Sequence, residues 1–161
     1  DWESACVRLA NWVRLEELRS GAEFRLVNTH LDHVSQPARE GQAGLLVEDA
    51  RAYPAAYPQI LTGDFNADGA NGAIAKLKAG GWRDSHEAVH GSVDPGPTFH
   101  AFKGPAFEGA EGKIDWIFTR GAVEVESAGI VRDAEGGRFP SDHYFLLVDL
   151  IVMSGPTERA S

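Results

Sequence analysis

The sequence predicts an α/β fold, because short strand-like runs alternate with segments of helical character. Residues 59–62 are apolar or β-branched and indicate a buried strand. Apolar side chains recur at helical spacing in residues 38–53, and a shorter helical segment covers residues 72–79. This order of strand, helix, strand and helix is typical of α/β proteins. The 161 residues have the size of one domain, without an internal repeat.

The composition excludes several classes of protein. The chain contains a single cysteine, Cys6, so it cannot form an internal disulfide. Its formal net charge of −9 is unlike that of a nonspecific nucleic-acid binder, which needs basic residues to contact phosphates. No apolar run in the sequence is long enough to cross a membrane. Clustered carboxylates would suit a site for a divalent cation, which would offset part of this charge.

A β-hairpin is expected near the N-terminus. Apolar and polar residues mostly alternate in residues 7–15, and residues 23–28 form the returning strand after the turn signal Ser20-Gly21. A helix through residues 16–18 is the alternative for the first of these segments.

Polar residues follow the returning strand where it ends. His30 and Asp32 would share one side if the extended backbone continued, and His33 comes next. A histidine can donate a proton or a hydrogen bond near neutral pH. Asp32 and His33 could either support the site residues or be polar residues that merely end the strand. Arg8, on the preceding strand, could reach a site or form a surface salt bridge.

The stretch that begins at Asp64 is the centre of the candidate site. Asp64 and Asn66 follow the strand 59–62 and precede a turn at residues 67–69. Residues i and i+2 of an extended backbone point to the same side, so a carboxylate and an amide would face one volume. Such a pair suits a metal ion, a phosphoryl oxygen or an activated water, and a polar turn that merely ends the strand is the alternative.

The two helices have recognisable ends. The cap of the first helix is expected at Ser35 or the next residue, with Pro37 in its first turn. Asn71 is the candidate cap of the second helix, and Gly80 is expected to end it in the left-handed conformation.

A long loop is expected over residues 82–112, which are rich in proline and glycine. Within it, Thr98 and His100 place a hydroxyl and an imidazole on either side of an aromatic residue. Loops of this length without structure of their own are uncommon and often functional.

The remaining sequence predicts strands at residues 113–118, 123–131 and 144–153. Asp115 is a carboxylate in an otherwise apolar run, and it needs a partner if it is buried. Asp142 and His143 stand directly before the last strand. Residues 154–161 are polar and are expected to form a frayed tail.

The singled-out side chains are those used in metal-assisted hydrolysis of phosphate esters: His30, Asp64, Asn66, Asp115, Asp142 and His143. A divalent cation neutralises phosphate charge, and a histidine oriented by a carboxylate removes a proton from water. A zinc hydrolase is a weaker alternative, because no helix carries histidines at positions i and i+4 beside a glutamate.

Four motifs in this order resemble the endonuclease/exonuclease/phosphatase family: Asn-Thr-His-Leu, Gly-Asp-Phe-Asn, Ile-Asp-Trp-Ile-Phe and Ser-Asp-His. The resemblance covers nearly the whole chain and is closest to small bacterial members. It implies a four-layer α/β/β/α sandwich like that of deoxyribonuclease I, of which residues 1–153 would be the C-terminal portion. It also implies Mg²⁺ or Mn²⁺ as the cofactor and a phosphate ester of unreadable class as the substrate.

The resemblance also implies a role for each residue. His143 resembles the catalytic base, held by Asp115. Asp64 and Asn66 resemble the pair that positions water and phosphate and binds a second metal ion. His30 resembles the group that stabilises the scissile phosphate. The implied metal ligand is Asp142, and the implied substrate-binding residues at the rim are Thr98, His100 and Arg8.

One departure from the family pattern is large. The glutamate that serves the family as principal metal ligand follows a strand, and no glutamate of this chain stands in that context. Asp1 is not a translation start, so the N-terminal strands are expected to be missing. We therefore expect the missing segment of the same protein, or a second copy, to complete the site. A catalytically inactive fragment that folds or self-associates is the alternative.

Overall fold

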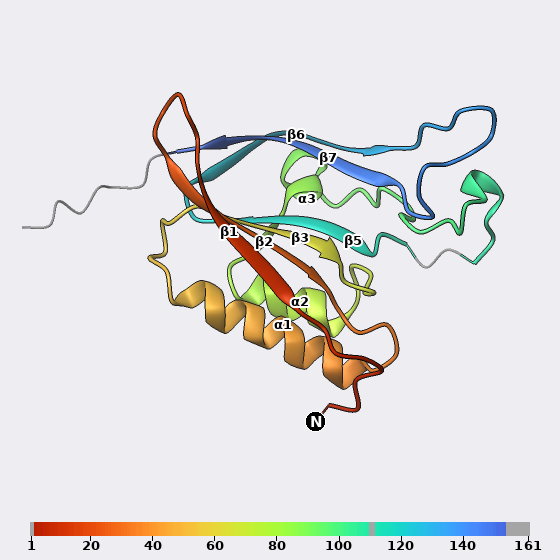
Figure 1. The fold of residues 1–161 in the computed structure, drawn as a ribbon, viewed down its shortest axis with the longest axis horizontal. Helices are drawn as coiled ribbons and strands as arrows, with labels where there is room; N and C mark the ends of the chain where they lie inside the picture. The colour runs from red at the N-terminus through yellow and green to blue at the C-terminus, as the bar shows by residue number, and fades with distance from the viewer. Residues whose placement is uncertain (1, 110–111, 154–161) are drawn as a thin grey trace, which may run out of the picture.

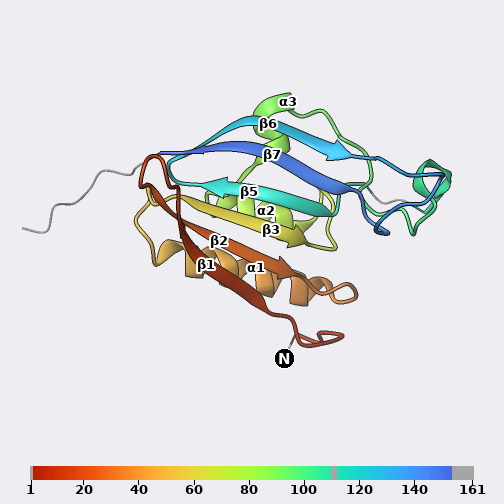
Figure 2. The ribbon, with the colours of Figure 1, turned by 45° about the horizontal axis from the view of Figure 1, so that its top comes forward.

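The computed structural model describes residues 2–109 and 112–153, which form three layers (Figures 1 and 2). A five-stranded sheet lies between two helices on one face and a two-stranded sheet on the other. The larger sheet has the order β1-β2-β3-β5-β4, with β1 (Ala10–Glu16), β2 (Glu23–His30), β3 (Gln59–Asp64), β4 (Arg83–Asp84) and β5 (Asp115–Arg120). The smaller sheet pairs β6 (Val123–Val131) with β7 (Phe145–Val152). The helices are α1 (Gln36–Arg51), α2 (Gly72–Ala79), α3 (Ser85–His90) and a 3-10 turn at Gly104–Ala106.

The N-terminal hairpin is confirmed. β1 and β2 pair antiparallel in an unbroken register from Ala10 opposite Thr29 to Glu16 opposite Glu23. Gly21 adopts a φ of 69° in the connecting turn, a conformation that favours glycine. The segment 10–16 is therefore a strand, and the helical alternative is wrong.

The β2–α1–β3 unit is also confirmed. β3 runs parallel to β2, and α1 makes the crossover between them. Ser35 caps α1, since its side chain accepts a hydrogen bond from the Ala38 N–H. Asn71 caps α2 in the same manner through the Ala73 N–H. Gly80 ends α2 as predicted, but its expected left-handed conformation is wrong: its φ is −77°, and the positive φ falls on Gly81, at 93°.

The core fills the space between the larger sheet and the two helices below it (Figure 1). Leu61 of β3 and Phe118 of β5 pair across the sheet on this face, and both are fully buried. Ile74 and Leu77 of α2 complete the same cluster. Full burial of such side chains contributes about 1.5–3 kcal/mol each. This burial determines which side chains of β3 and β5 face the helices. The alternate residues of the two strands then point to the opposite face, toward β6 and β7.

The segment 82–112 is only in part the loop that the sequence predicts. It contains β4 and α3 and the 3-10 turn, and Asp84 caps α3 by accepting the His86 N–H. The sequence did not predict α3, because a helix of six residues is too short to show a helical period of apolar side chains. α3 packs against β6. The predicted tail at residues 154–161 lies outside the described residues.

Candidate functional site

Three strand ends bring three polar residues into one row. His30 of β2 stands opposite Asp64 of β3, and Asp64 stands opposite Asp115 of β5. Directly paired residues of neighbouring strands project from the same face of a sheet. The row therefore lies on the face turned away from α1 and α2. The His30 Nε2 is 3.3 Å from Asp64 Oδ2, so the histidine reaches the central carboxylate.

His143 joins the row from the segment that enters the smaller sheet. Its Nδ1 lies 2.7 Å from Asp115 Oδ2, and its Nε2 lies 4.0 Å from Asp64 Oδ2. Because an ionised carboxylate only accepts hydrogen bonds, the imidazole must carry its proton on Nδ1. The Nε2 of neutral His143 then presents a lone pair beside Asp64, which is the arrangement of a general base held by a carboxylate.

Asp64 is the most perturbed group of the row. Burial raises the pKa of its carboxyl, and the neighbouring Asp115 carboxylate adds to this rise. The Asn66 N–H donates to Asp64 Oδ1 at 2.8 Å and partly opposes it. Ligand atoms of Asp64, Asp115 and His143 lie within 4.8 Å of one another, so a cation could contact all three. A divalent ion there would relieve the repulsion between the two carboxylates.

Two side-chain arrangements differ from the expectation of an extended backbone. β3 ends at Asp64, and Asn66 adopts a φ of 46°, so the two residues meet through a turn. The Asn66 Nδ2 donates to the Leu31 carbonyl at 3.0 Å, which fixes the amide beside the row. Asp32 does not share a side with His30: it is buried, and its Oδ1 accepts the N–H groups of Val34 and Ser35.

The expectation that Thr98 and His100 line the rim of the site is wrong. Thr98 is fully buried, and His100 is 2% exposed. The Thr98 hydroxyl accepts hydrogen bonds from the backbone of the strand that carries Asp115. Because both side chains are buried, neither offers surface to a substrate. Arg8 contacts His33 instead of the row, with its Nη2 3.0 Å from the His33 Nδ1.

Asp142 is not brought into the group of ligand atoms formed by Asp64, Asp115 and His143. Its carbonyl accepts the N–H groups of His100 and Ala101, and its carboxylate is 3.5 Å from the Ser141 hydroxyl. Its role as a metal ligand stays a prediction.

Sequence reasoning missed a buried ion pair that anchors the entry to β5. The Lys113 Nζ donates to both carboxylate oxygens of Asp84, at 2.9 and 2.7 Å. It also lies 3.8 Å from the centroid of the Trp116 ring. Burial outweighs the attraction of Asp84 and lowers the pKa of Lys113 below its usual value. The lysine two positions before Asp115 was a weak signal, but its partner 29 residues away could not be read from the sequence.

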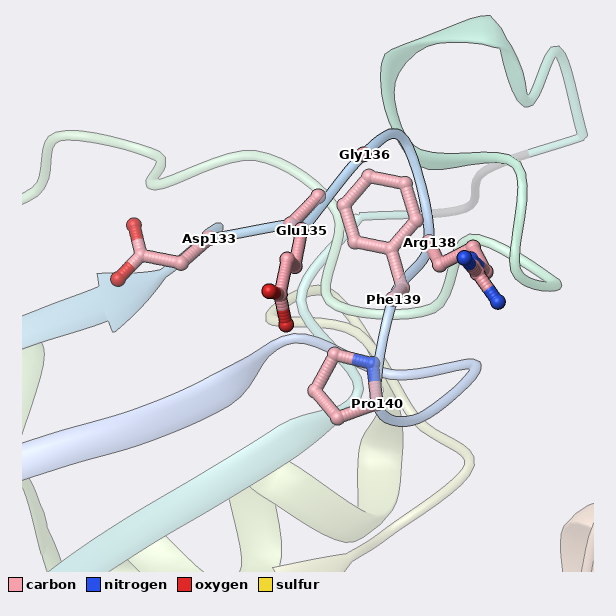
Figure 3. A pocket seen from close by; sticks show the side chains of 7 residues that line it. Asp133, Glu135, Gly136, Arg138, Phe139 and Pro140 are labelled. Atoms are coloured by element: carbon pink, nitrogen blue, oxygen red, sulfur yellow. The ribbon is translucent and has the colours of Figure 1, made fainter.

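A hollow elsewhere in the structure does not extend the site. It has a volume of about 840 Å³, is lined by the loop from Asp133 to Pro140 and contains none of the row residues (Figure 3).

Cys6, Asp32 and His33 also have potential ligand atoms within 4.8 Å. The Asp32 oxygens already accept four hydrogen bonds, from Ser4, Ala5, Val34 and Ser35, which opposes metal binding there.

None of the helices within residues 2–109 and 112–153 combines the length and apolar character needed to span a membrane.

Comparison with known proteins bears on the family and the fold. A search of curated proteins found no match. An endonuclease/exonuclease/phosphatase from Bacteroides vulgatus superposes with a TM-score of 0.81 at 30% identity, and the match covers 94% of this chain and 58% of that one. A mannosyl-6-phosphatase from Bacteroides thetaiotaomicron gives 0.80 at 29% identity, covering 93% and 59%. Human nocturnin, at 23% identity and a TM-score of 0.69 over 91% and 53%, shares the fold.

The chain thus spans less than two thirds of the length of these structures. The sequence profile of the Endonuclease/Exonuclease/phosphatase family matches residues 1–143, which is most of the chain. This chain therefore belongs to the endonuclease/exonuclease/phosphatase family, whose members hydrolyse phosphate esters.

Proposed function

We propose that this chain carries the general-base half of a divalent-metal-dependent phosphoesterase site. The observation that carries the proposal is the His143–Asp115 hydrogen bond of 2.7 Å, with the opposite ring nitrogen of His143 directed toward Asp64. Family membership and the similarity to a mannosyl-6-phosphatase support hydrolysis of phosphate esters. The substrate is a phosphomonoester or a phosphodiester.

The donor set fits a hard divalent cation. Asp64 offers carboxylate oxygens beside a second carboxylate, and Mg²⁺ and Mn²⁺ favour oxygen ligands. Asp64 would hold the ion together with Asn66, two residues further on, and Asp142, which directly precedes His143 in the sequence. When bound, such an ion neutralises phosphate charge and stabilises the leaving oxygen.

Residues of the chain would carry out proton transfer, orientation of the water and binding of the phosphate. His143 Nε2 accepts a proton from the attacking water, and the Asp115 carboxylate stabilises the imidazolium that results. Asp64 lies within 4.0 Å of this nitrogen and is placed to orient the water. His30, whose side chain is more than half exposed, reaches outward from Asp64 and can donate to a phosphoryl oxygen.

We further propose that residues outside this chain complete the site. Apolar side chains are exposed on two strands, with Val13 49% and Leu15 40% exposed on β1 and Phe145 51% and Leu147 58% exposed on β7. The related structures are also much longer than this chain. A segment of the same protein or a second copy would cover these side chains, form the fourth layer and supply a further acidic ligand. In the alternative, the chain is an inactive fragment that self-associates.

The test compares turnover of the chain with and without the upstream segment, using a panel that begins with sugar phosphates and dye phosphodiesters. Activity should vanish in a chelator and return with Mg²⁺ or Mn²⁺. His143→Ala should lower kcat by about 10²–10⁴-fold, the usual contribution of a general base. His90→Ala, on α3, is the matched control and should keep normal turnover. Full activity in excess chelator, or normal turnover of His143→Ala, would contradict the proposal.

A further inference from the structure

A four-residue segment, Thr98–Ala101, joins the two backbone regions that carry Asp115 and His143. We call it the 98–101 clasp. On one side, the Thr98 hydroxyl accepts hydrogen bonds from the Ile114 N–H at 3.0 Å and the Asp115 N–H at 3.1 Å. One side-chain oxygen therefore holds the backbone at the first residue of β5.

On its other side, the 98–101 clasp holds the backbone around His143. The Thr98 carbonyl accepts the Tyr144 N–H at 2.8 Å. The His100 and Ala101 N–H groups both donate to the Asp142 carbonyl, at 2.8 and 3.1 Å. Phe99 lies opposite His143 in an isolated antiparallel bridge, with the two rings 5.0 Å apart. Both neighbours of His143 are thus fixed to the clasp.

The clasp is rigid because its surroundings are packed. The His100 ring lies 4.1 Å from Tyr144 and 4.6 Å from Phe139, measured between centroids, and its Nδ1 accepts the Gly104 N–H. Thr98 and His100 are buried, so neither side chain is available to a substrate. A buried threonine whose oxygen accepts two backbone N–H groups cannot move without leaving both donors unpaired.

We propose that Thr98 is a positioning residue that sets the distance between Asp115 and His143 and thereby keeps the proton of His143 on Nδ1. This inference rests on the proposed function, because it assigns the dyad a catalytic task. The two members of the dyad stand 28 residues apart and enter different sheets. The 98–101 clasp holds the backbone at Asp115 through the Thr98 hydroxyl and the backbone on either side of His143 through its own backbone groups, whereas the dyad itself is joined by one side-chain hydrogen bond.

The test uses Thr98→Val, which keeps the shape of the side chain and removes the acceptor. Thr98→Ser restores the hydroxyl. The matched control is Thr119→Val: Thr119 is fully buried on β5, and its Oγ1 has no hydrogen-bond partner. The first readout is the ¹⁵N chemical shift of each His143 ring nitrogen, measured at a pH at which the imidazole is neutral. Asp115→Asn defines the signal of a ring that has lost its orienting carboxylate.

Thr98→Val should move the His143 signals toward those of Asp115→Asn and lower kcat by about 10- to 100-fold, with KM changed less than threefold. Thr98→Ser and Thr119→Val should keep the parent signals and kcat. A folded Thr98→Val protein with the parent tautomer would overturn the inference. If the chain together with the upstream segment hydrolyses no phosphate ester, the proposed function fails, yet the tautomer comparison still decides the role of Thr98.

Amide exchange in the unmodified protein provides an independent check if Thr98→Val does not fold. The N–H groups of Ile114, Asp115 and Tyr144 should exchange as slowly as those within β3 and β5. Exchange at the rate of exposed loop amides would refute the clasp.

Discussion

Replacing Lys113 by methionine should strongly destabilise the fold. The Lys113 side chain is 6% exposed and its partner Asp84 is 7% exposed, so the substitution would leave a buried carboxylate without its cation. Breaking one side of a buried pair typically costs about 3–5 kcal/mol. For a domain of this size, each kcal/mol corresponds to roughly 2–4 °C, so Tm should fall by about 6–20 °C.

The lowered pKa of Lys113 sharpens this prediction. Burial lowers this pKa despite the attraction of Asp84, and a buried ion pair in general adds little net stability because desolvation opposes the attraction. Most of the expected loss therefore comes from the carboxylate left behind. Asp84→Asn removes that charge but keeps an oxygen to accept the His86 N–H at the start of α3. The double variant Lys113→Met/Asp84→Asn should recover at least half of the lost stability.

Thermal and urea unfolding, followed by circular dichroism, would measure the four members of this double-mutant cycle. A Lys113→Met protein whose Tm stays within about 2 °C of the parent would refute the reasoning. So would a double variant that is less stable than the single one, because it would show that the charge of Asp84 was not the cause.

Two further predictions concern Asp64 and the glycine that precedes it. In a chelating buffer, Asp64→Asn should stabilise the protein at pH 7: the raised pKa of Asp64 means that folding favours its protonated form, so its contribution is present at low pH and lost as pH rises. The difference in urea midpoint should disappear below the ordinary carboxyl pKa of about 4, and equal midpoints at pH 7 would contradict the sign. Gly63→Ala should cost about 3 kcal/mol or more, because Gly63 has a φ of 148° and a Cβ there would lie 1.8 Å from the Thr29 carbonyl oxygen. Gly129→Ala, where a Cβ meets open space, is its control and should stay within about 1 kcal/mol in the same unfolding assay.

The sequence predicted the elements well where local pattern decides them. The hairpin, α1 with its Ser35 cap and the strands carrying Asp64 and Asp115 follow from periodicity and end signals. His30 and Asp64 end their strands as predicted, and β5 begins at Asp115, two residues later than predicted. Their assembly into one row depends on which strands are neighbours and in what register, and a single sequence does not contain that information directly.

The errors arose where tertiary contacts override local geometry. An extended backbone would place the Asn66 side chain beside that of Asp64. Instead, Asn66 adopts a φ of 46°, and its amide donates to the carbonyl of Leu31, which directly follows β2. Thr98 looked like an exposed loop residue because its hydroxyl had no local partner, and its partners 16 and 17 residues away bury it. The Asp84–Lys113 pair was invisible for the same reason.

If the proposed function holds, the pairing of His30, Asp64 and Asp115 across three strands would make hydrolysis a strict reporter of strand alignment. If β3 slipped by one position against β2, Asp64 would rotate toward the apolar interior and Gly63 or Phe65 would take its place. Such a mispaired chain could keep its secondary structure and its compactness, yet it would have no central carboxylate. Partial activity in a refolded sample would then measure the fraction of molecules with correctly aligned strands, and not a uniformly weakened population. A lowered turnover per mole of folded protein would thus reveal misaligned molecules, which circular dichroism does not distinguish from correctly folded ones.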